Sequence, residues 1–200
     1  MAVDVSSPRR TRAERQAETV RALTDAAAEL FLRDGYTATS VSAVAARAGL
    51  TTGALYANFG GKASLGLAAL DRIRAVQLAD LAQHLGAAGD FTERMERLGT
   101  WTERVVGTSG WPRFELEFAL AARDEPALEQ PLYERRAMLH DALAVVIERQ
   151  LEETGATALL PTEDMVRALL GVGIGIAVQR MLDPSIPVDT LPRLFNSLVR

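Results

Sequence analysis

The sequence predicts an all-α protein of about nine helices, and three observations support this fold class. Alanine, leucine, arginine and glutamate dominate the 200 residues, and all four are good helix formers. Apolar residues recur at the three- and four-residue spacing of an amphipathic helix along most of the chain. No segment alternates apolar and polar residues convincingly, and no Asn-Gly or Asp-Gly pair joins two such segments into a hairpin.

The predicted helices begin at capping residues or prolines and end at glycines or polar turns. Gly35 ends the first helix, because glycine accepts the left-handed conformation of a C-cap. Either Thr39 or Ser40 caps the second helix, and either Thr51 or Thr52 caps the third. The expected helices cover about Arg12–Arg33, Val41–Ala48, Thr52–Asn58, Lys62–Leu85, Phe91–Val106, Trp111–Arg123, Pro126–Glu153, Thr162–Leu182 and Val188–Val199.

The composition is that of a globular protein, with 48% hydrophobic and 24% charged residues. Cysteine is absent, which excludes disulfide frameworks, thiolate metal sites and cysteine nucleophiles. Only two histidines occur, His84 and His140, so mechanisms that need several imidazoles are excluded. No apolar stretch follows the early arginines, and the uncharged apolar run between Arg167 and Arg180 is too short to span a bilayer. We therefore expect a cytoplasmic protein without a membrane partner.

Charge is distributed unevenly along the chain. Residues 1–62 carry eight basic and six acidic side chains, a net charge of +2, whereas residues 63–200 carry fourteen and twenty, a net charge of −6. No acidic residue occurs from Gly35 to Leu70, where only Arg47 and Lys62 are charged. Such a segment behind an arginine-rich arm can approach phosphates without repulsion. A neutral packing surface with a solvated tail explains the charge pattern about equally well.

Residues 35–62 have the pattern of two short helices joined by a tight turn. The small side chain of Ala45 lets a second helix cross closely, and Gly49, four residues later, makes the turn. The start of the second helix, where a recognition helix reaches base edges in the major groove, then consists of Thr51, Thr52, Gly53, Ala54 and Tyr56. An αα-hairpin inside a larger bundle is the alternative, and the pattern alone favours DNA binding only modestly.

This segment resembles the N-terminal domain of the TetR family of transcriptional repressors. The residues that carry the resemblance are Phe31, Gly35, Tyr36, Thr39, Ser40, Val41, Val44, Ala45, Ala48, Gly49, Leu50, Thr51, Gly53, Leu55, Tyr56, Phe59, Lys62 and Leu65. The chain departs from the family pattern at Ala63, where an acidic residue is usual, and this weakens the cap of the following helix.

The resemblance implies a role in DNA binding for specific residues. Arg9, Arg10 and Arg12 would reach the backbone or minor groove, and Thr39 or Ser40 would hold a phosphate at a helix start. The remaining implied contacts are to phosphates by Tyr56 and Lys62, and to bases by Thr51, Thr52, Gly53 and Ala54. Because no arginine, glutamine or asparagine begins this helix, thymine-methyl contacts and DNA shape must supply much of the specificity.

The resemblance also implies two domains, a DNA-binding domain over residues 1–61 and an effector-binding and dimerisation domain over residues 62–200. The glycines at 171, 173 and 175 do not fit a dinucleotide fingerprint, because their spacing fails and no strand precedes them. Family members dimerise through their last two helices. The expected dimer seam comprises Leu170, Gly171, Ile174, Gly175, Val178, Leu194, Phe195 and Leu198.

An effector pocket is expected where aromatic residues concentrate. Aromatic and aliphatic walls with a few polar groups suit a drug-sized ligand, and a methionine makes such a wall adaptable. The candidate lining residues are Phe91, Trp101, Trp111, Phe114, Glu115, Phe118 and Met138. Plain core packing is the alternative for each of them.

These inferences predict a ligand-responsive regulator, a homodimeric repressor that binds a palindromic operator in double-stranded DNA and is released by a small, mostly apolar effector. The chain shows no Gly-x-Ser-x-Gly elbow, no HExxH motif and no metal-spaced cluster, so we expect no enzyme, no metal and no cofactor. A helical protein-interaction module without specific DNA binding is the main alternative, but it leaves the basic arm and the acid-free segment unexplained.

Overall fold

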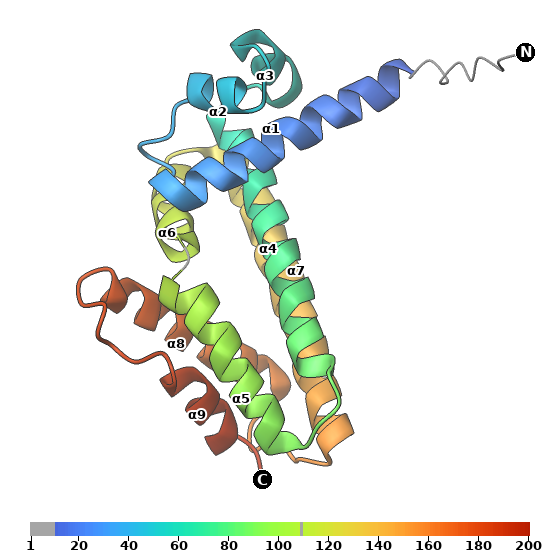
Figure 1. The fold of residues 1–200 in the computed structure, drawn as a ribbon, viewed down its shortest axis with the longest axis vertical. Coiled ribbons are helices and arrows are strands. Elements are labelled where there is room, and N and C mark those ends of the chain that lie inside the picture. The colour runs from blue at the N-terminus through green and yellow to red at the C-terminus, as the bar shows by residue number, and fades with distance from the viewer. Residues whose placement is uncertain (1–10, 109) are drawn as a thin grey trace, which may run out of the picture.

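The structure is a computed structural model that describes residues 11–108 and 110–200. The expected DNA contacts Arg9 and Arg10 lie outside the described residues. Within the described residues the fold is all-α, as predicted (Figure 1). Its elements are α1 (Arg12–Asp34), α2 (Val41–Arg47), α3 (Thr52–Phe59), α4 (Lys62–Gly86), α5 (Phe91–Thr102), the π-helical turn η1 (Glu103–Thr108), α6 (Trp111–Ala122), α7 (Pro126–Thr154), α8 (Thr162–Arg180) and α9 (Thr190–Ser197).

Two of the expected helices differ from the structure in a way that sequence periodicity does not reveal. The fifth helix stops at Thr102 and continues as η1, because a change to i→i+5 bonding leaves no clear mark in the sequence. The ninth helix is shorter than expected, since Val199 pairs with Ala158 in an isolated antiparallel bridge. The Thr157 amide donates to the Arg200 carbonyl oxygen at 2.8 Å in the same contact.

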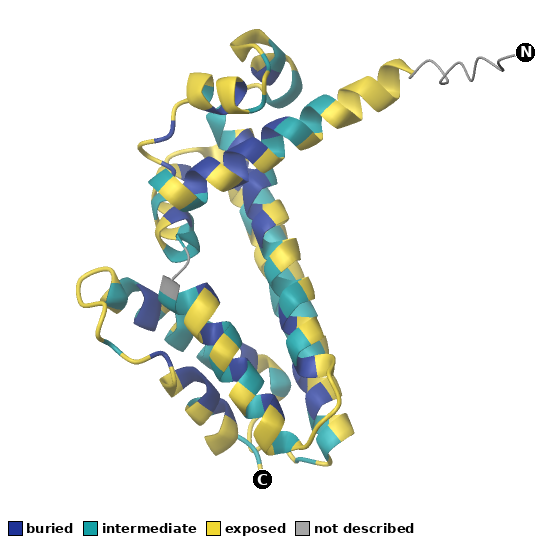
Figure 2. Ribbon diagram, viewed as in Figure 1, coloured by how far each residue is buried: buried dark blue, intermediate teal, exposed yellow. Residues whose placement is uncertain are grey.

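The apolar side chains form two cores at opposite ends of the long helix α4. The first core joins α1, α4 and α6 and includes Phe31, Leu65 and Phe114, all fully buried. The second core joins the far halves of α4 and α7 to α5, α8 and α9. Figure 2 shows buried residues where α1 crosses α4, whereas the first turns of α1 are exposed. The helices α4 and α7 lie side by side and connect the two cores (Figure 1).

Every described helix is either too short or too polar to cross a membrane.

Candidate DNA-binding surface and effector cavity

The turn between α2 and α3 has the geometry of a helix-turn-helix. Gly49 adopts φ of 68°, in the left-handed region that glycine accepts without strain. The Leu50 amide donates to the Ala45 carbonyl oxygen at 2.9 Å, which closes the turn. Ala45 is buried, as its small side chain on the inner face predicts. The turn therefore fixes α3 across α2, with Leu55 of α3 anchored in the core.

The outward face of α3 carries small polar and apolar groups and no charge. Thr51 is the N-cap, because its Oγ1 accepts a hydrogen bond from the Ala54 amide at 3.1 Å. Thr52 and Gly53 are exposed, and Tyr56 keeps 53% of its surface exposed. These positions face outward as a recognition helix requires, and the exposed phenol of Tyr56 is free to reach a phosphate or a base edge.

The structure separates the two candidates for phosphate binding at the start of α2. Thr39 is buried, and its Oγ1 donates to the Gly35 carbonyl oxygen at 2.7 Å, so its hydroxyl faces inward. We therefore drop Thr39 as a phosphate contact. Ser40 is exposed and caps α2, with its Oγ accepting from the Ala43 amide at 3.1 Å. Ser40 is the candidate that remains.

The side chain of Lys62 is partly buried, whereas the expected contact with a phosphate needs an exposed lysine. Its Nζ lies 4.4 Å from the centre of the Tyr36 ring and donates to the Thr37 carbonyl oxygen at 3.4 Å. Burial lowers the pKa of Lys62, and Glu117 opposes this effect. The lysine thus holds the segment before α2 against α4, and a phosphate contact by Lys62 requires its side chain to leave Tyr36.

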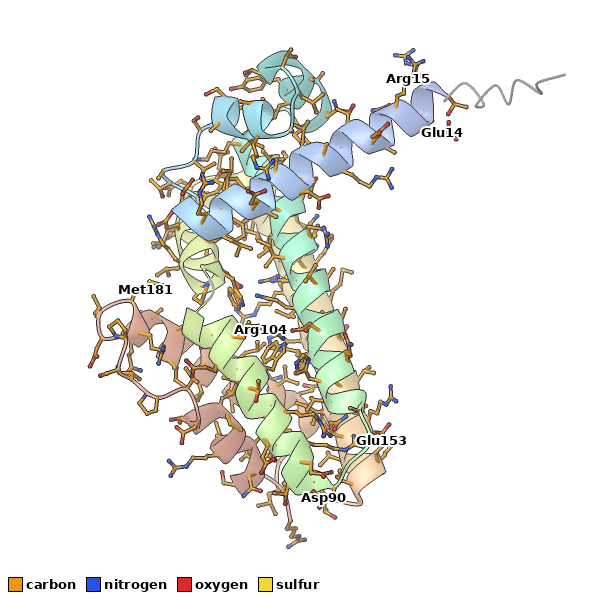
Figure 3. All side chains as sticks on the ribbon, viewed as in Figure 1. Glu14, Arg15, Asp90, Arg104, Glu153 and Met181 are labelled. Atoms are coloured by element: carbon orange, nitrogen blue, oxygen red, sulfur yellow. The ribbon has the colours of Figure 1, made fainter. Side chains whose placement is uncertain are left out.

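Arg15 of α1 and Arg47 of α2 are exposed and were absent from the predicted contacts, whereas Arg12 was among them. Arg12 and Arg15 are both exposed at the start of α1, one helical turn apart. In Figure 3 Arg15 projects to the side on which α2 and α3 lie, whereas Glu14 projects away from it. Arg47 is exposed on α2 and pairs with Glu29 of α1 at 2.6 Å. The three-residue spacing from Arg12 was the signal for Arg15.

A contact from α6 fixes the segment that leads into the helix-turn-helix. The Glu117 carboxylate accepts a hydrogen bond from the Thr37 amide at 2.7 Å and another from Arg113 at 2.7 Å. Burial alone raises the pKa of Glu117, but its bonds from Thr37 and Arg113 outweigh burial and hold the pKa below its usual value. No sequence signal marks this contact, because the two partners are 80 residues apart.

A first cavity of about 150 Å³ lies in the second core, between α4, α5, α7 and α8. Its wall is almost entirely apolar, and Leu98, Ile147 and Leu169 are typical of its lining. Trp101 and Trp111, two of the residues predicted to line a pocket, both contribute to this wall.

A second, larger cavity of about 660 Å³ lies between α6, α7 and α8 beside α4. It is lined by Glu115 and Phe118 of α6, which the sequence analysis also placed in a pocket. The ion pair between Arg74 and Glu115 joins α4 to α6 at this place. The two cavities adjoin, since both are lined by Arg74, Trp111, Leu139, Leu170 and Ile174.

Three of the residues expected to line a pocket line neither of these two cavities. Phe114 is fully buried in the first core, where its ring stacks on Phe31 at a centroid distance of 5.2 Å. Phe91 packs against Phe195, and Met138 is 69% exposed on α7. The expectation is corrected for all three, because closeness in sequence does not decide which face of a helix a residue occupies.

The expected dimer seam is exposed only in part. Gly171 and Ile174 are exposed, and a Cβ added at Gly171 or Gly175 would meet no atom within 4 Å. Leu170, Val178, Leu194 and Leu198 are half-buried. Phe195 is 4% exposed and lines the first cavity, so it belongs to the core of its own chain and we remove it from the seam. No close helix approach within the described chain accounts for the glycines of α8.

Comparisons with known proteins agree with this geometry. Residues 23–69 match the family model described as bacterial regulatory proteins of the tetR family. No curated protein matches the sequence. The reduced form of NemR from E. coli is 17% identical, covering 91% of this chain and 97% of its own, with a TM-score of 0.71.

Two solved complexes have the same fold. The multidrug binding protein EbrR complexed with imidazole is 24% identical and covers 97% of both chains, with a TM-score of 0.66. SmeT in its triclosan complex is 20% identical, covering 91% of this chain and 92% of its own, with a TM-score of 0.59. The similarity therefore extends over the cavity-bearing helices as well as the helix-turn-helix.

Proposed function

We propose that this chain, which carries the DNA-binding domain of the TetR family of regulators on the fold of that family, is a ligand-responsive repressor. In this proposal a homodimer binds a palindromic operator and leaves it when a small, mostly apolar effector binds. The observation that carries the proposal is the exposed, uncharged face of α3 behind the Gly49 turn, flanked by the arginines of α1. A protein with this role acts in the cytoplasm, where bacterial DNA is found.

The proposed DNA contacts divide into base contacts and phosphate contacts. Thr52, Gly53 and Ala54 approach base edges, and Tyr56 and Ser40 approach phosphates. The arginines of the arm and of α1 reach the adjacent backbone or minor groove. Because α3 offers no bidentate arginine or amide on its exposed face, we expect specificity to come from thymine methyl groups and from DNA shape.

The effector is proposed to bind in the adjoining cavities between α4 and α8. The apolar wall of the first cavity and the larger volume of the second support this placement, and the solved EbrR and SmeT complexes show that proteins of this fold hold small molecules. α6 lines both cavities through Trp111 and holds Thr37 through Glu117, so a shift of α6 would change the position of the helix-turn-helix. Release of DNA requires that the effector bind the shifted state more tightly.

The proposal is tested by fluorescence anisotropy on DNA that flanks the gene, with a scrambled duplex as reference and a series of salt concentrations. Specific binding should weaken steeply with salt, by about 0.9 logarithmic units per tenfold salt for each neutralised phosphate. The double variant Thr52→Ala, Tyr56→Ala should lose specific binding. The matched control is Thr92→Ala, Tyr133→Ala, which changes an exposed threonine and tyrosine on α5 and α7.

Each outcome has a distinct meaning. If the α3 double variant and the control variant both bind the operator as tightly as the parent, the assignment of the DNA-binding surface is wrong. Weak and equal binding to both duplexes would instead favour a helical protein-interaction module.

A further inference from the structure

The charged residues that α7 contributes to the second cavity are segregated along the helix. The residues of α7 that line the cavity form a single stripe, whose charged or titratable members are Glu129, Arg136 and His140, and Glu125 lines the cavity just before α7 begins. From Glu129 to His140 the stripe extends about 17 Å at 1.5 Å per residue. The acidic residues occupy the end beside the α6–α7 turn, and the basic residues occupy the other end.

Three nitrogen-bearing side chains meet at the basic end. Arg136 and His140 come from α7, and Arg167 comes from the facing helix α8. Burial lowers the pKa of His140, and the charges of Arg136 and Arg167 lower it further, with Asp141 opposing them. The two guanidinium groups are thus close enough to act on the same ring.

The positive charge at this end is only partly neutralised. Arg136 is exposed to solvent, and the described residues provide no hydrogen bond or ion pair for it. Arg167 pairs with Glu163 and Asp164, but these are exposed partners on its own helix and such pairs are weak in water. Uncompensated cations beside a partly enclosed cavity favour an anionic ligand.

Elsewhere in the same cavity acidic residues lie together with arginines. Glu115 is paired with Arg74 through Oε1, whereas its buried Oε2 has no hydrogen-bond partner among the described residues. Glu125 and Glu129 share their end with Arg123, which lines the same cavity. Between the two ends the wall is apolar, with Leu132, Leu139 and Leu170, and it continues into the first cavity.

We propose that the ligand of this site is an amphipathic monocarboxylate, with its apolar body between α6 and α8 and its carboxylate at Arg136, His140 and Arg167. The regulatory meaning of this site rests on the proposed function, but its ligand chemistry does not depend on DNA. The guanidinium of Arg136 supplies the charge-assisted hydrogen bonds that distinguish the carboxylate from a neutral end group.

The test uses three probes with the same apolar chain: octanoate, octan-1-ol and octylammonium. Binding is followed by tryptophan fluorescence, because the two tryptophans of the chain both line the first cavity and Trp111 also lines the second. Octanoate should bind about tenfold more tightly than octan-1-ol, and octylammonium should bind most weakly. Equal or reversed affinities, or no binding of any probe, would overturn the proposal.

Two variants locate the carboxylate. Arg136→Gln should weaken octanoate binding about tenfold and leave octan-1-ol binding unchanged. Arg149→Gln, which changes an exposed arginine of the same helix that lines neither cavity, should change neither. An equal loss for both probes in Arg136→Gln would show that the arginine only shapes the cavity, which overturns its role.

Proton NMR of the histidine rings gives a readout that is independent of affinity. A bound carboxylate favours the imidazolium form, so octanoate should raise the pKa of His140. The two histidines are distinguished with His140→Gln. An unchanged His140 pKa at saturating octanoate would contradict the placement. Octanoate binding without operator release would preserve this site and contradict only its regulatory role.

Discussion

The carboxylate of Glu117 on α6 accepts a 2.7 Å hydrogen bond from the backbone amide of Thr37, in the segment that leads into α2. A Cβ added at Gly35 would lie 2.8 Å from the same carboxylate, so a glycine is needed there for the close approach as well as for its φ of 86°. The contact joins a helix that lines both cavities to the element that carries the helix-turn-helix. It is therefore one described connection between the candidate effector site and the candidate DNA-binding surface.

The Glu117 contact should make stability depend on pH. The folded state holds the pKa of Glu117 below its usual value, so the folded state binds fewer protons than the unfolded state near that pKa. The resulting stabilisation is present above the usual pKa of a glutamate and is lost as the pH falls through the lowered value. Urea unfolding at about pH 6 and about pH 3 measures this loss, which should be smaller in Glu117→Gln than in the parent. Equal losses in both proteins would contradict the assignment.

The packing of α6 against α4 makes a second prediction. A Cβ added at Gly66 of α4 would lie 2.5 Å from Cε2 of Phe118, a ring that is almost fully buried. Overpacking of this kind costs about 1–3 kcal/mol, so Gly66→Ala should lower the free energy of unfolding by that amount. Gly86→Ala is the matched control on the same helix, since its Cβ would meet no atom within 4 Å. Thermal or urea denaturation that ranks the two variants equally would refute the steric explanation.

The sequence could predict those parts of the fold and site that depend on neighbouring residues. The turn at Gly49 and the caps of α2 and α3 are local, and the structure contains them. The choice between Thr39 and Ser40 depended on a carbonyl oxygen of the α1–α2 segment that binds the Thr39 hydroxyl. Trp111 and Phe114 lie within one turn of α6, yet only Trp111 lines a cavity, because the neighbouring helices decide which face is filled. Such non-local packing is not encoded in spacing.

A buried arginine is another non-local feature that residue spacing does not reveal, and it makes a third prediction. Arg94 of α5 is 7% exposed, and its guanidinium donates to the Leu85 carbonyl oxygen, to Gln150 at 2.8 Å and to Glu153 at 2.6 Å. In Figure 3 Asp90 and Glu153 lie at the same end of the molecule, where α5 begins and α7 ends. Arg94→Met should destabilise the fold by about 2–4 kcal/mol, since it leaves buried acceptors without a donor.

The control for Arg94 uses the other arginine on the same carboxylate. Arg149 pairs with Glu153 at 2.6 Å, but its side chain is 63% exposed. Arg149→Met should leave the urea midpoint essentially unchanged, because exposed ion pairs contribute little. If both variants unfold at the same midpoint, the buried network is not what holds α5 to α7.

The exposed face of α8 makes the fourth prediction, which concerns the proposed dimer. A Cβ at Gly171 would meet no atom within 4 Å in the single chain, where Gly171 also lines the second cavity, so Gly171→Arg should cause no clash within the monomer. If a partner helix packs closely on this face, the arginine would place an unpaired charge and a large side chain in the interface. Analytical ultracentrifugation should then find the variant as a monomer and the parent as a dimer.

Ala79→Arg, at an exposed position of α4, adds the same side chain away from the seam and should remain dimeric. A dimeric Gly171→Arg variant would show that the subunits associate through another surface, and the open space beside the α8 glycines would then need a different explanation.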